Sequence, residues 1–282
     1  MTTGIEVDSY IDGVCEQRRR REAMLREERS WLTLAGLFWL QPGANRFGRS
    51  PDNDLVLPGA TTPDHAGLLI LEGGEVRLEA PPGLVTSGDG QTVPRRQLHA
   101  DDTASPDYLS LATLTILVIK RKARVGVRVW DAASPARAAF GGLRWHPIRP
   151  EYCLTARFTP YDPLRPLPIV DVLGDEYIKT TPGYVCFDWQ GEEYRLDAED
   201  RGNHLFFNFK DGTNGDATYP AGRFLYTNAP ENGKVTLDFN LATNPFCAYT
   251  SYATCPLPPQ QNRLSIRIEA GEMNFQLGGE AG

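Results

Sequence analysis

The sequence predicts a mostly β protein, with an N-terminal helix, a β-sandwich and then a second antiparallel, barrel-like β domain. Two observations support this prediction. First, the 282 residues include 27 glycines and 22 prolines, a composition that favours many short elements joined by tight turns. Second, the segments between the turns are short and either apolar or alternating. Residues 234–240 show the alternation most clearly, because apolar and polar side chains take turns along them, as in a half-buried strand.

Residues 1–40 form the predicted N-terminal helical segment. Residues 5–30 are rich in Glu, Arg, Ala, Met and Leu, which favour helix. Residues 18–21 are consecutive arginines with acidic residues three or four positions away, so we expect a solvated helix face; a phosphate or membrane contact is the alternative. Residues 31–40 are strongly apolar but too few to span a bilayer, so we expect them to dock the helix onto the body of the protein.

Residues 41–132 are predicted to form the sandwich, because Gly, Pro and Asn punctuate short apolar runs. Residues 45–57 (NRFGRSPDNDLVL) resemble the opening of forkhead-associated (FHA) domains, sandwich domains that recognise phosphothreonine through an arginine, a serine and a following asparagine. Arg49 and Ser50 match this pattern loosely, and the nearest approach to the later Ser-x-x-His motif is residues 64–67 (DHAG). The resemblance implies an FHA-like fold, and we expect no phosphopeptide binding.

Two strands are expected at the end of the sandwich. Residues 113–120 (TLTILVIK) form a continuous apolar run, as in a strand covered on both faces. Residues 124–130 (RVGVRVW) alternate, so Arg128 is expected to leave the sandwich and to point at whatever packs beside it. The expected boundary of the domain lies in residues 132–139.

Residues 133–282 are predicted to form the second β domain. Its candidate strands are residues 152–158, 169–173, 185–189, 193–196, 204–209, 223–226, 235–240 and 264–270. Short strands with hairpin-like gaps can close a barrel or stack as a sandwich, and we expect barrel-like closure.

A series of motifs lies close together near the C-terminus. They are residues 211–225 (DGTNGDATYPAGRFL), 237–240 (LDFN), 244–249 (NPFCAY), 254–259 (TCPLPP), 262–264 (NRL) and 270–272 (AGE). Together they resemble a bacterial and archaeal family known as domain of unknown function 1684. Residues 31–40 and 126–128 also match the family pattern, so the resemblance covers nearly the whole chain. It implies kinship without implying a reaction.

The same stretch supplies the candidate site. Asp238 and Asn240 point the same way from one strand, and in a barrel that face looks into the lumen, where an enclosed acid can have a raised pKa. We therefore predict that Asp238 is catalytic, as an acid or base, and that it shares one enclosed cavity with Arg223. The predicted substrate-binding residues, in which arginines would clamp an anionic group, are Arg128, Tyr219, Arg223, Asn240, Asn244 and Arg263.

Structural roles are the alternatives for these residues. Asp238 can form an ion pair with Arg263 or Arg223. Asp211 and Gly215 can belong to a structural turn in which Asp211 accepts backbone N–H groups and Arg223 pairs with a nearby acid.

The cysteines are expected to be free thiols, because there are five of them, an odd number, and they are scattered. The spacing of Cys247 and Cys255 fits no usual zinc site, and the histidines show no metal spacing, so we predict no metal. We interpret both cysteines as small apolar residues in a rigid proline-rich loop, with a Cys247–His204 pair formed through the fold as the alternative. No P-loop, dinucleotide fingerprint or nucleophile elbow occurs, so no cofactor is predicted.

The net charge of −7 argues against a nucleic-acid-binding protein, and no stretch approaches the ~20 apolar residues of a membrane helix. Because the N-terminus also lacks an apolar signal core, we expect a cytoplasmic protein without nucleic-acid or membrane partners.

Two functions compete on these grounds. One is an enzyme that acts on a small polar or anionic organic molecule by acid/base chemistry in a pocket of the second β domain. The other is a non-catalytic module that binds a small ligand or a protein. An enzyme should enclose its acid beside the arginines, whereas a binding module should show an exposed groove or an apolar patch.

Overall fold

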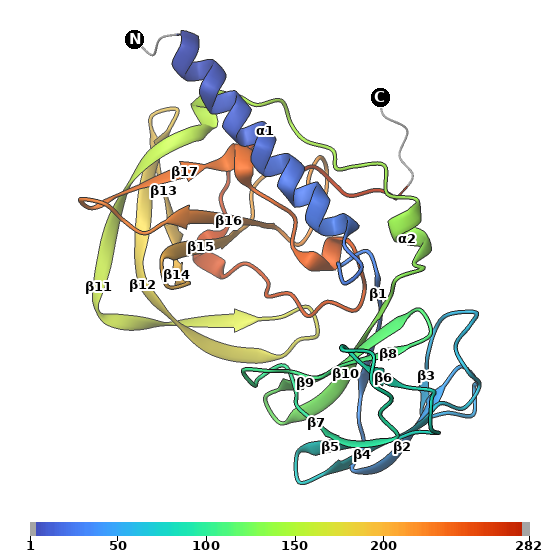
Figure 1. Cartoon of the computed structure of the whole chain (residues 1–282). Helices are drawn as coiled ribbons and strands as arrows, with labels where there is room; N and C mark the ends of the chain where they lie inside the picture. Colours follow the sequence, from blue (N-terminus) through green and yellow to red (C-terminus); the bar gives the residue numbers. More distant parts are fainter. Residues whose placement is uncertain (1–3, 278–282) are drawn as a thin grey trace. The chain divides into compact units, whose positions relative to one another are not determined.

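A computed structural model describes residues 4–277, which are mostly β with an N-terminal helix (Figure 1). The chain divides into two units. The sandwich unit comprises residues 24–140, and the larger unit comprises the chain before residue 24 together with the chain from residue 141 onward. The long helix α1 (Gly4–Arg26) therefore belongs to the larger unit over most of its length. None of the helices described here is long and apolar enough to cross a membrane.

The sandwich unit contains two five-stranded sheets around one core. The first has the order β1 (Leu34–Trp39), β10 (Arg124–Asp131), β9 (Leu114–Arg121), β8 (Tyr108–Leu111) and β6 (Thr86–Ser87). The second has the order β3 (Leu55–Val56), β2 (Gly43–Gly48), β4 (Gly67–Glu72), β5 (Glu75–Glu79) and β7 (Arg95–Leu98). Val127 of the first sheet and Leu69 of the second belong to the same buried cluster, as expected for stacked sheets. The short helix α2 (Pro135–Ala138) lies near the end of the unit.

Residues 1–40 are not one helical segment. Residues 34–39 form β1, which pairs antiparallel with β10 and places Leu37 opposite Arg128. The pairing has a physical reason, because without β1 one edge of β10 would present unpaired backbone donors and acceptors. The apolar residues expected to dock the helix are therefore an edge strand of the sandwich unit.

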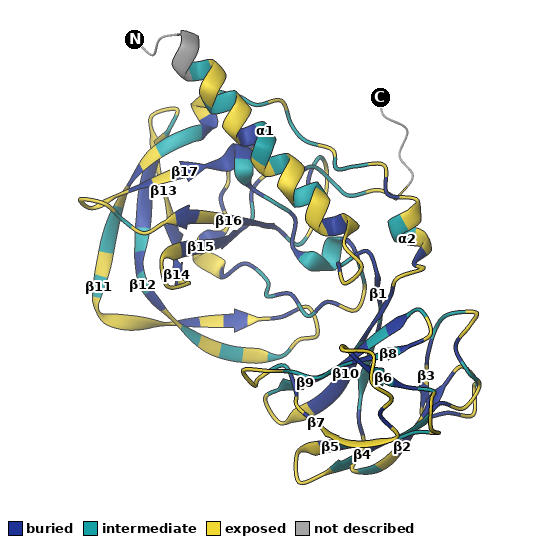
Figure 2. Cartoon of the chain, in the orientation of Figure 1, coloured by how far each residue is buried: buried dark blue, intermediate teal, exposed yellow. Residues whose placement is uncertain are grey.

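The larger unit contains two antiparallel sheets. One has the order β13 (Glu192–Asp197), β12 (Glu176–Trp189), β11 (Cys153–Val170) and β17 (Lys234–Asp238). The other has the order β14 (Glu199–Asp200), β15 (His204–Phe209) and β16 (Arg223–Asn228). Phe187 of the first sheet and Phe207 of the second belong to one buried cluster. Figure 2 shows β15 and β17 buried over most of their length, which places the core along these strands.

Neither of these described sheets closes into a barrel, which corrects the closure expected from the sequence. The four-stranded sheet ends at β17 and the three-stranded sheet ends at β16. Residues 264–270, predicted as a further strand, are irregular. Their backbone is engaged in another way, because the carbonyls of Ile268 and Ala270 accept hydrogen bonds from the side chain of Arg223. Those carbonyls are therefore occupied by a side chain instead of a strand ladder.

The strands predicted at residues 152–158 and 169–173 are parts of one 18-residue strand, β11, and of the turn after it. β11 pairs antiparallel with β12, with a register shift between Pro160 and Arg165. Such an irregularity accommodates prolines, because a proline has no backbone N–H to give to the ladder. The prolines at positions 160, 163, 166 and 168 therefore lie within a continuous strand.

Candidate functional site

Asp238 lies at the end of β17, where the chain enters the short 3-10 helix η2 (Phe239–Leu241). Its carboxylate caps this helix by accepting the backbone N–H of Asn240 at 3.0 Å. The side-chain amide of Asn240 also donates to it, at 3.1 Å. The flanking Leu237 and Phe239 belong to the core, so the alternation predicted from the sequence leaves Asp238 facing away from that cluster. Asp238 is nevertheless only 8% exposed.

The remaining partner of Asp238 comes from α1. The hydroxyl oxygen of Tyr10 lies 3.0 Å from both carboxylate oxygens. It also accepts a hydrogen bond from the Asn240 amide at 2.9 Å. Because a phenol has one proton to donate, that proton is directed at Asp238. The Asn240 side chain is itself held by the backbone of Arg149, which donates to its oxygen at 3.1 Å and accepts from its nitrogen at 2.9 Å.

Asp238 lines a pocket of about 510 Å³. Residues of α1, of several strands and of η2 line it: Tyr10, Gly13, Val14, Gln17, Cys153, His204, Tyr226, Thr227, Asn228, Thr236, Asp238 and Leu241. The polar members of this set are hydroxyl, amide, thiol, imidazole and carboxyl groups. Neither lysine nor arginine is among these described lining residues, so the pocket lacks the arginine clamp expected from the sequence.

Burial raises the pKa of Asp238, because loss of water disfavours the carboxylate, although hydrogen bonds from Tyr10 and Asn240 oppose the shift. The charge of Arg18 also acts against the shift, as the weakest of these effects. Burial raises the pKa of Tyr10 far above its ordinary value, so this phenol stays a hydrogen-bond donor at neutral pH. It also raises the pKa of Cys153, another lining residue.

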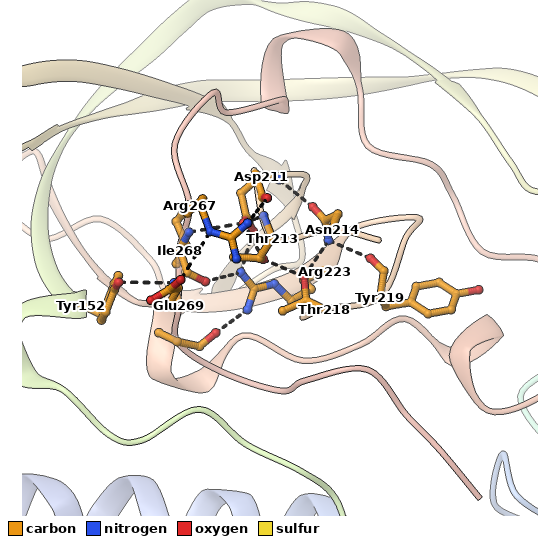
Figure 3. A network of polar contacts seen from close by, with 12 residues as sticks. Tyr152, Asp211, Thr213, Asn214, Thr218, Tyr219, Arg223, Arg267, Ile268 and Glu269 are labelled. Atoms are coloured by element: carbon orange, nitrogen blue, oxygen red, sulfur yellow. Dashed lines mark hydrogen bonds and ion pairs between the residues drawn. The ribbon is translucent and has the colours of Figure 1, made fainter. Parts of the chain in front are cut away.

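Arg223 does not line this pocket. It begins β16 and is 0% exposed. Figure 3 shows its guanidinium beside Asp211 and Ile268: it lies 2.6 Å from the Asp211 carboxylate and donates to the Ile268 carbonyl at 2.9 Å. Asp211 in turn accepts the backbone N–H of Thr213 at 2.8 Å. Arg223 and Asp211 therefore have the structural role given above as the alternative, a turn with a buried ion pair. The prediction that Arg223 shares a cavity with Asp238 is wrong.

Asn244 belongs to a second buried network, which is built around Glu272. Asn244 donates to the Glu272 carboxylate from its backbone at 3.0 Å and from its amide at 2.9 Å, and the Tyr249 hydroxyl donates to the same carboxylate. Arg21 of α1 lies 3.8 Å from Glu272 and donates to the Asn244 carbonyl at 3.0 Å. Burial raises the pKa of Glu272. Asn244 therefore has a structural position outside the pocket of Asp238.

Tyr219 and Arg263 also lie apart from the pocket lining. The Tyr219 hydroxyl donates to the backbone carbonyl of Cys247 at 3.1 Å. Arg263 is exposed just after the short helix η4 (Gln260–Asn262).

Arg128 packs against aromatic residues of the sandwich unit. Its guanidinium lies 5.4 Å from the ring of Trp31 and 5.9 Å from the ring of Trp130. Stacking on aromatic faces is a favourable arrangement for a partly buried arginine. Of the predicted site residues, Asp238 is the one found among the described lining residues of the pocket, and Asn240 is hydrogen-bonded to it.

The arginine run of α1 is the part of the site that sequence reasoning missed. Arg19 and Arg20 pair with Glu16, as expected for a solvated helix face. Arg18 instead donates to the Asn240 backbone carbonyl at 3.1 Å, and Arg21 joins the Glu272 network. Two of the four arginines, Arg18 and Arg21, therefore bind groups in the interior of the larger unit.

A signal for this arrangement exists in the sequence. Tyr10, Val14, Arg18 and Arg21 follow one another at intervals of three or four residues, which places them on one face of a helix. The pattern is hidden because arginine counts as a surface residue, although its long stem and flat head can lie against buried groups.

The cysteines and histidines of the sequence hypotheses lie in different parts of the structure. His204 lines the pocket of Asp238, and Cys247 does not. All five cysteines are free thiols in the structure. Within residues 4–277, no three His, Cys, Asp or Glu side chains are grouped so that they can hold a metal ion.

We expect a phosphothreonine peptide not to bind the sandwich unit. Arg49, the residue that matches the FHA pattern, lies 2.7 Å from the carboxylate of Asp64, so a phosphate would have to displace an acid. Isothermal titration of the full chain with such a peptide should give no heat of binding. Asp64→Ala, which frees Arg49, is the matched control for the displaced acid. Binding by the unmodified chain that disappears in Arg49→Ala would contradict this expectation.

Comparisons with known proteins complete the description. Residues 138–273 match a family described as protein of unknown function (DUF1684). An uncharacterized protein of Haloarcula marismortui, solved by NMR, is 33% identical, with 49% of this chain and 78% of that one covered and a TM-score of 0.41. The FHA-2 domain of a Mycobacterium tuberculosis ABC transporter is also structurally similar, at 23% identity, 32% and 77% coverage and a TM-score of 0.24. No curated protein matches this sequence.

Proposed function

The chain belongs to the DUF1684 family over residues 138–273, and from this premise we propose that the larger unit is an enzyme that acts on a small polar organic molecule by acid/base chemistry. Asp238 is the proposed acid or base. One observation carries the proposal: a buried carboxylate whose hydrogen-bond partners are neutral lines a pocket of about 510 Å³. That volume lies within the range of about 300–1,000 Å³ that is usual for small-molecule sites.

The hydrogen bonds around Asp238 favour a role in proton transfer. Asn240 donates to Tyr10, and Tyr10 donates to Asp238, so the carboxylate is the acceptor at the end of this chain. The two donors hold its orientation without neutralising its charge. The raised pKa brings the carboxyl group closer to neutral pH, where a group that both takes up and releases protons is most effective. Tyr10 is a positioning residue in this proposal.

The lining of the pocket favours an uncharged polar substrate. Gln17, Asn228 and Thr236 offer amide and hydroxyl groups that can hydrogen-bond to substrate hydroxyl or carbonyl groups. The imidazole of His204 can donate or accept a hydrogen bond. An anionic substrate is disfavoured, because it would meet the carboxylate of Asp238 without a lysine or arginine among the described lining residues.

We expect Asp238→Asn to lower turnover by about 10²–10⁴-fold, the usual contribution of a positioned acid or base, while the affinity for the ligand changes little. A thermal-shift screen of small neutral polar metabolites identifies ligands of the unmodified chain, and NMR then follows their conversion. Asp216→Asn is the matched control, because Asp216 is exposed and its carboxylate pairs with Arg267 at the surface. Ligands that bind both proteins without any conversion would support the non-catalytic binding module instead.

The stability of Asp238→Asn gives an independent readout. The raised folded-state pKa means that the carboxylate adds stability only at low pH and loses it as the pH rises through that pKa. At neutral pH the amide should therefore leave the melting temperature unchanged or raise it, and this advantage should shrink on acidification. A loss of about 1–3 kcal/mol at neutral pH would indicate a purely structural acid. Tyr10→Phe should move the inflection of the pH–rate profile upward, because the hydrogen bond from Tyr10 lowers the pKa of Asp238.

A further inference from the structure

Cys247 and Cys255 lie in contact, although a seven-residue gap separates them in the sequence. The backbone N–H of Cys247 donates to the sulfur of Cys255 at 3.2 Å. Cys247 lies in the short helix η3 (Phe246–Ala248) and is half-buried, whereas Cys255 is only 4% exposed. The pair thus consists of one half-buried cysteine and one that is shielded from solvent. Neither cysteine lines the pocket of Asp238.

The segment around Cys255 is held by the turn between β11 and β12. The Cys255 carbonyl accepts the backbone N–H of Val172 at 3.0 Å, and the N–H of Leu257 donates to the Val170 carbonyl at 2.8 Å. The carbonyl of Pro256 accepts the amide of Asn208 of β15 at 2.9 Å. These bonds hold the Cys255 segment from both sides.

The Cys247 side of the pair is held by Tyr219, whose hydroxyl donates to the Cys247 carbonyl at 3.1 Å. The neighbouring thiol of Cys255 lowers the pKa of Cys247 to about 7, although burial opposes this shift. The same contact with Cys247 raises the pKa of Cys255 well above its ordinary range. One sulfur is therefore partly thiolate at neutral pH, while its neighbour keeps its proton.

This asymmetry is what a reactive thiol and its partner require. The thiolate is the nucleophile in cysteine chemistry, and at Cys247 the neighbouring thiol of Cys255 favours it. An accessible low-pKa cysteine beside a second cysteine is the arrangement that allows reversible oxidation, because the second thiol converts the first product into a disulfide.

We propose that Cys247 is a hydroperoxide-reactive thiol and that Cys255 is the thiol that resolves its oxidised form. In the first step the Cys247 thiolate attacks one peroxide oxygen and the O–O bond breaks. Cys247 is oxidised to a sulfenic acid, and the leaving hydroxide or alkoxide takes the electron pair and picks up a proton from water.

In the second step the sulfur of Cys255 attacks the sulfenic sulfur of Cys247 and the S–O bond breaks. The leaving hydroxide combines with the proton lost by Cys255 to form water, and a Cys247–Cys255 disulfide remains. Overall the hydroperoxide is reduced by two electrons and the dithiol is oxidised by two electrons. An external thiol reverses the change by exchange.

The test treats the full-length protein with hydrogen peroxide near stoichiometry and follows it by mass spectrometry. The expected result is the loss of two hydrogens and a peptide that joins Cys247 to Cys255. In Cys255→Ser, dimedone should trap a sulfenic acid on Cys247. Cys15→Ser removes another half-buried free thiol and should leave both results unchanged.

Two results would overturn the proposal: no Cys247–Cys255 disulfide at excess peroxide, or dimedone labelling of Cys247 no faster than that of Cys15. If Cys255→Ser does not fold, phenylarsine oxide tests the pair in the unmodified protein. It bridges adjacent thiols, so it should protect both Cys247 and Cys255 from alkylation, and failure to protect them would count against the proposal. None of these measurements depends on catalysis by Asp238.

Discussion

Replacing Arg223 with methionine should lower the free energy of unfolding of the larger unit by about 3–5 kcal/mol, the cost of breaking a buried ion pair from one side. Arg223 and Asp211 are both fully buried at the side chain, 2.6 Å apart. Methionine fills a similar volume, but it leaves the Asp211 carboxylate without its cation. It also leaves the Ile268 and Ala270 carbonyls without the donor that replaces a strand ladder.

Urea titration followed by hydrogen exchange of peptides from residues 204–228 measures this change in the larger unit alone. The matched control is Arg267→Met, because Arg267 is a half-exposed arginine that pairs with Asp216 and Glu269, and its loss should change the stability little. The double variant Arg223→Met/Asp211→Asn should regain part of the loss, since the stranded charge is removed. A loss below about 1 kcal/mol in the single variant would show that the pair is not a main support of this unit.

Arg21→Met should lower the stability of the larger unit by about 3 kcal/mol at neutral pH, the lower end of the cost of breaking a buried pair. Arg21 is the cation nearest to Glu272, and the side chains are 13% and 1% exposed. The distance of 3.8 Å is longer than in the Arg223 pair, which is why we expect a smaller effect. Arg21 also donates to the Asn244 carbonyl and the Tyr249 hydroxyl, so its loss should loosen α1 from the body of the unit.

This destabilisation should depend on pH. Burial raises the folded-state pKa of Glu272, so the stability that this group contributes is present at low pH and is lost as the pH rises through that pKa. Arg21 opposes the shift, and its removal should raise the pKa further. The difference between Arg21→Met and the unmodified protein should therefore shrink as the pH falls and Glu272 becomes neutral.

The neighbouring arginine is the control for this prediction. Arg20 has a side chain that is 74% exposed and pairs with Glu16 within the same helix, so Arg20→Met should cost about 0.5 kcal/mol or less. Thermal unfolding of both variants across pH, together with the rate of proteolysis within α1, compares them directly. Equal losses for Arg20→Met and Arg21→Met, or a loss that grows on acidification, would contradict the role given to Arg21.

The sequence by itself determined the local features of this protein. Turn residues and alternating segments predicted the mostly β class, and the alternation around Asp238 correctly set it against Leu237 and Phe239 of the core. Acidic residues beside the arginine run correctly predicted the surface pairs of Glu16 with Arg19 and Arg20. These features depend on residues within a few positions of one another, so their physical causes are contained in short stretches of sequence.

Only the tertiary structure decided how the sheets end and which polar groups meet. Closure into a barrel was expected, but Arg223 binds the carbonyls at residues 268 and 270 and no strand forms there. Asp238 was expected beside an arginine, and it meets Tyr10 of α1 instead. Buried carboxylates can be satisfied by many donors, and the sequence contains many candidates of similar chemistry. Contacts between distant residues decide which donor each carboxylate meets, and therefore how its pKa is shifted. Tyr10 and Asp238, for example, are more than 200 positions apart in the sequence and meet only once the chain has folded.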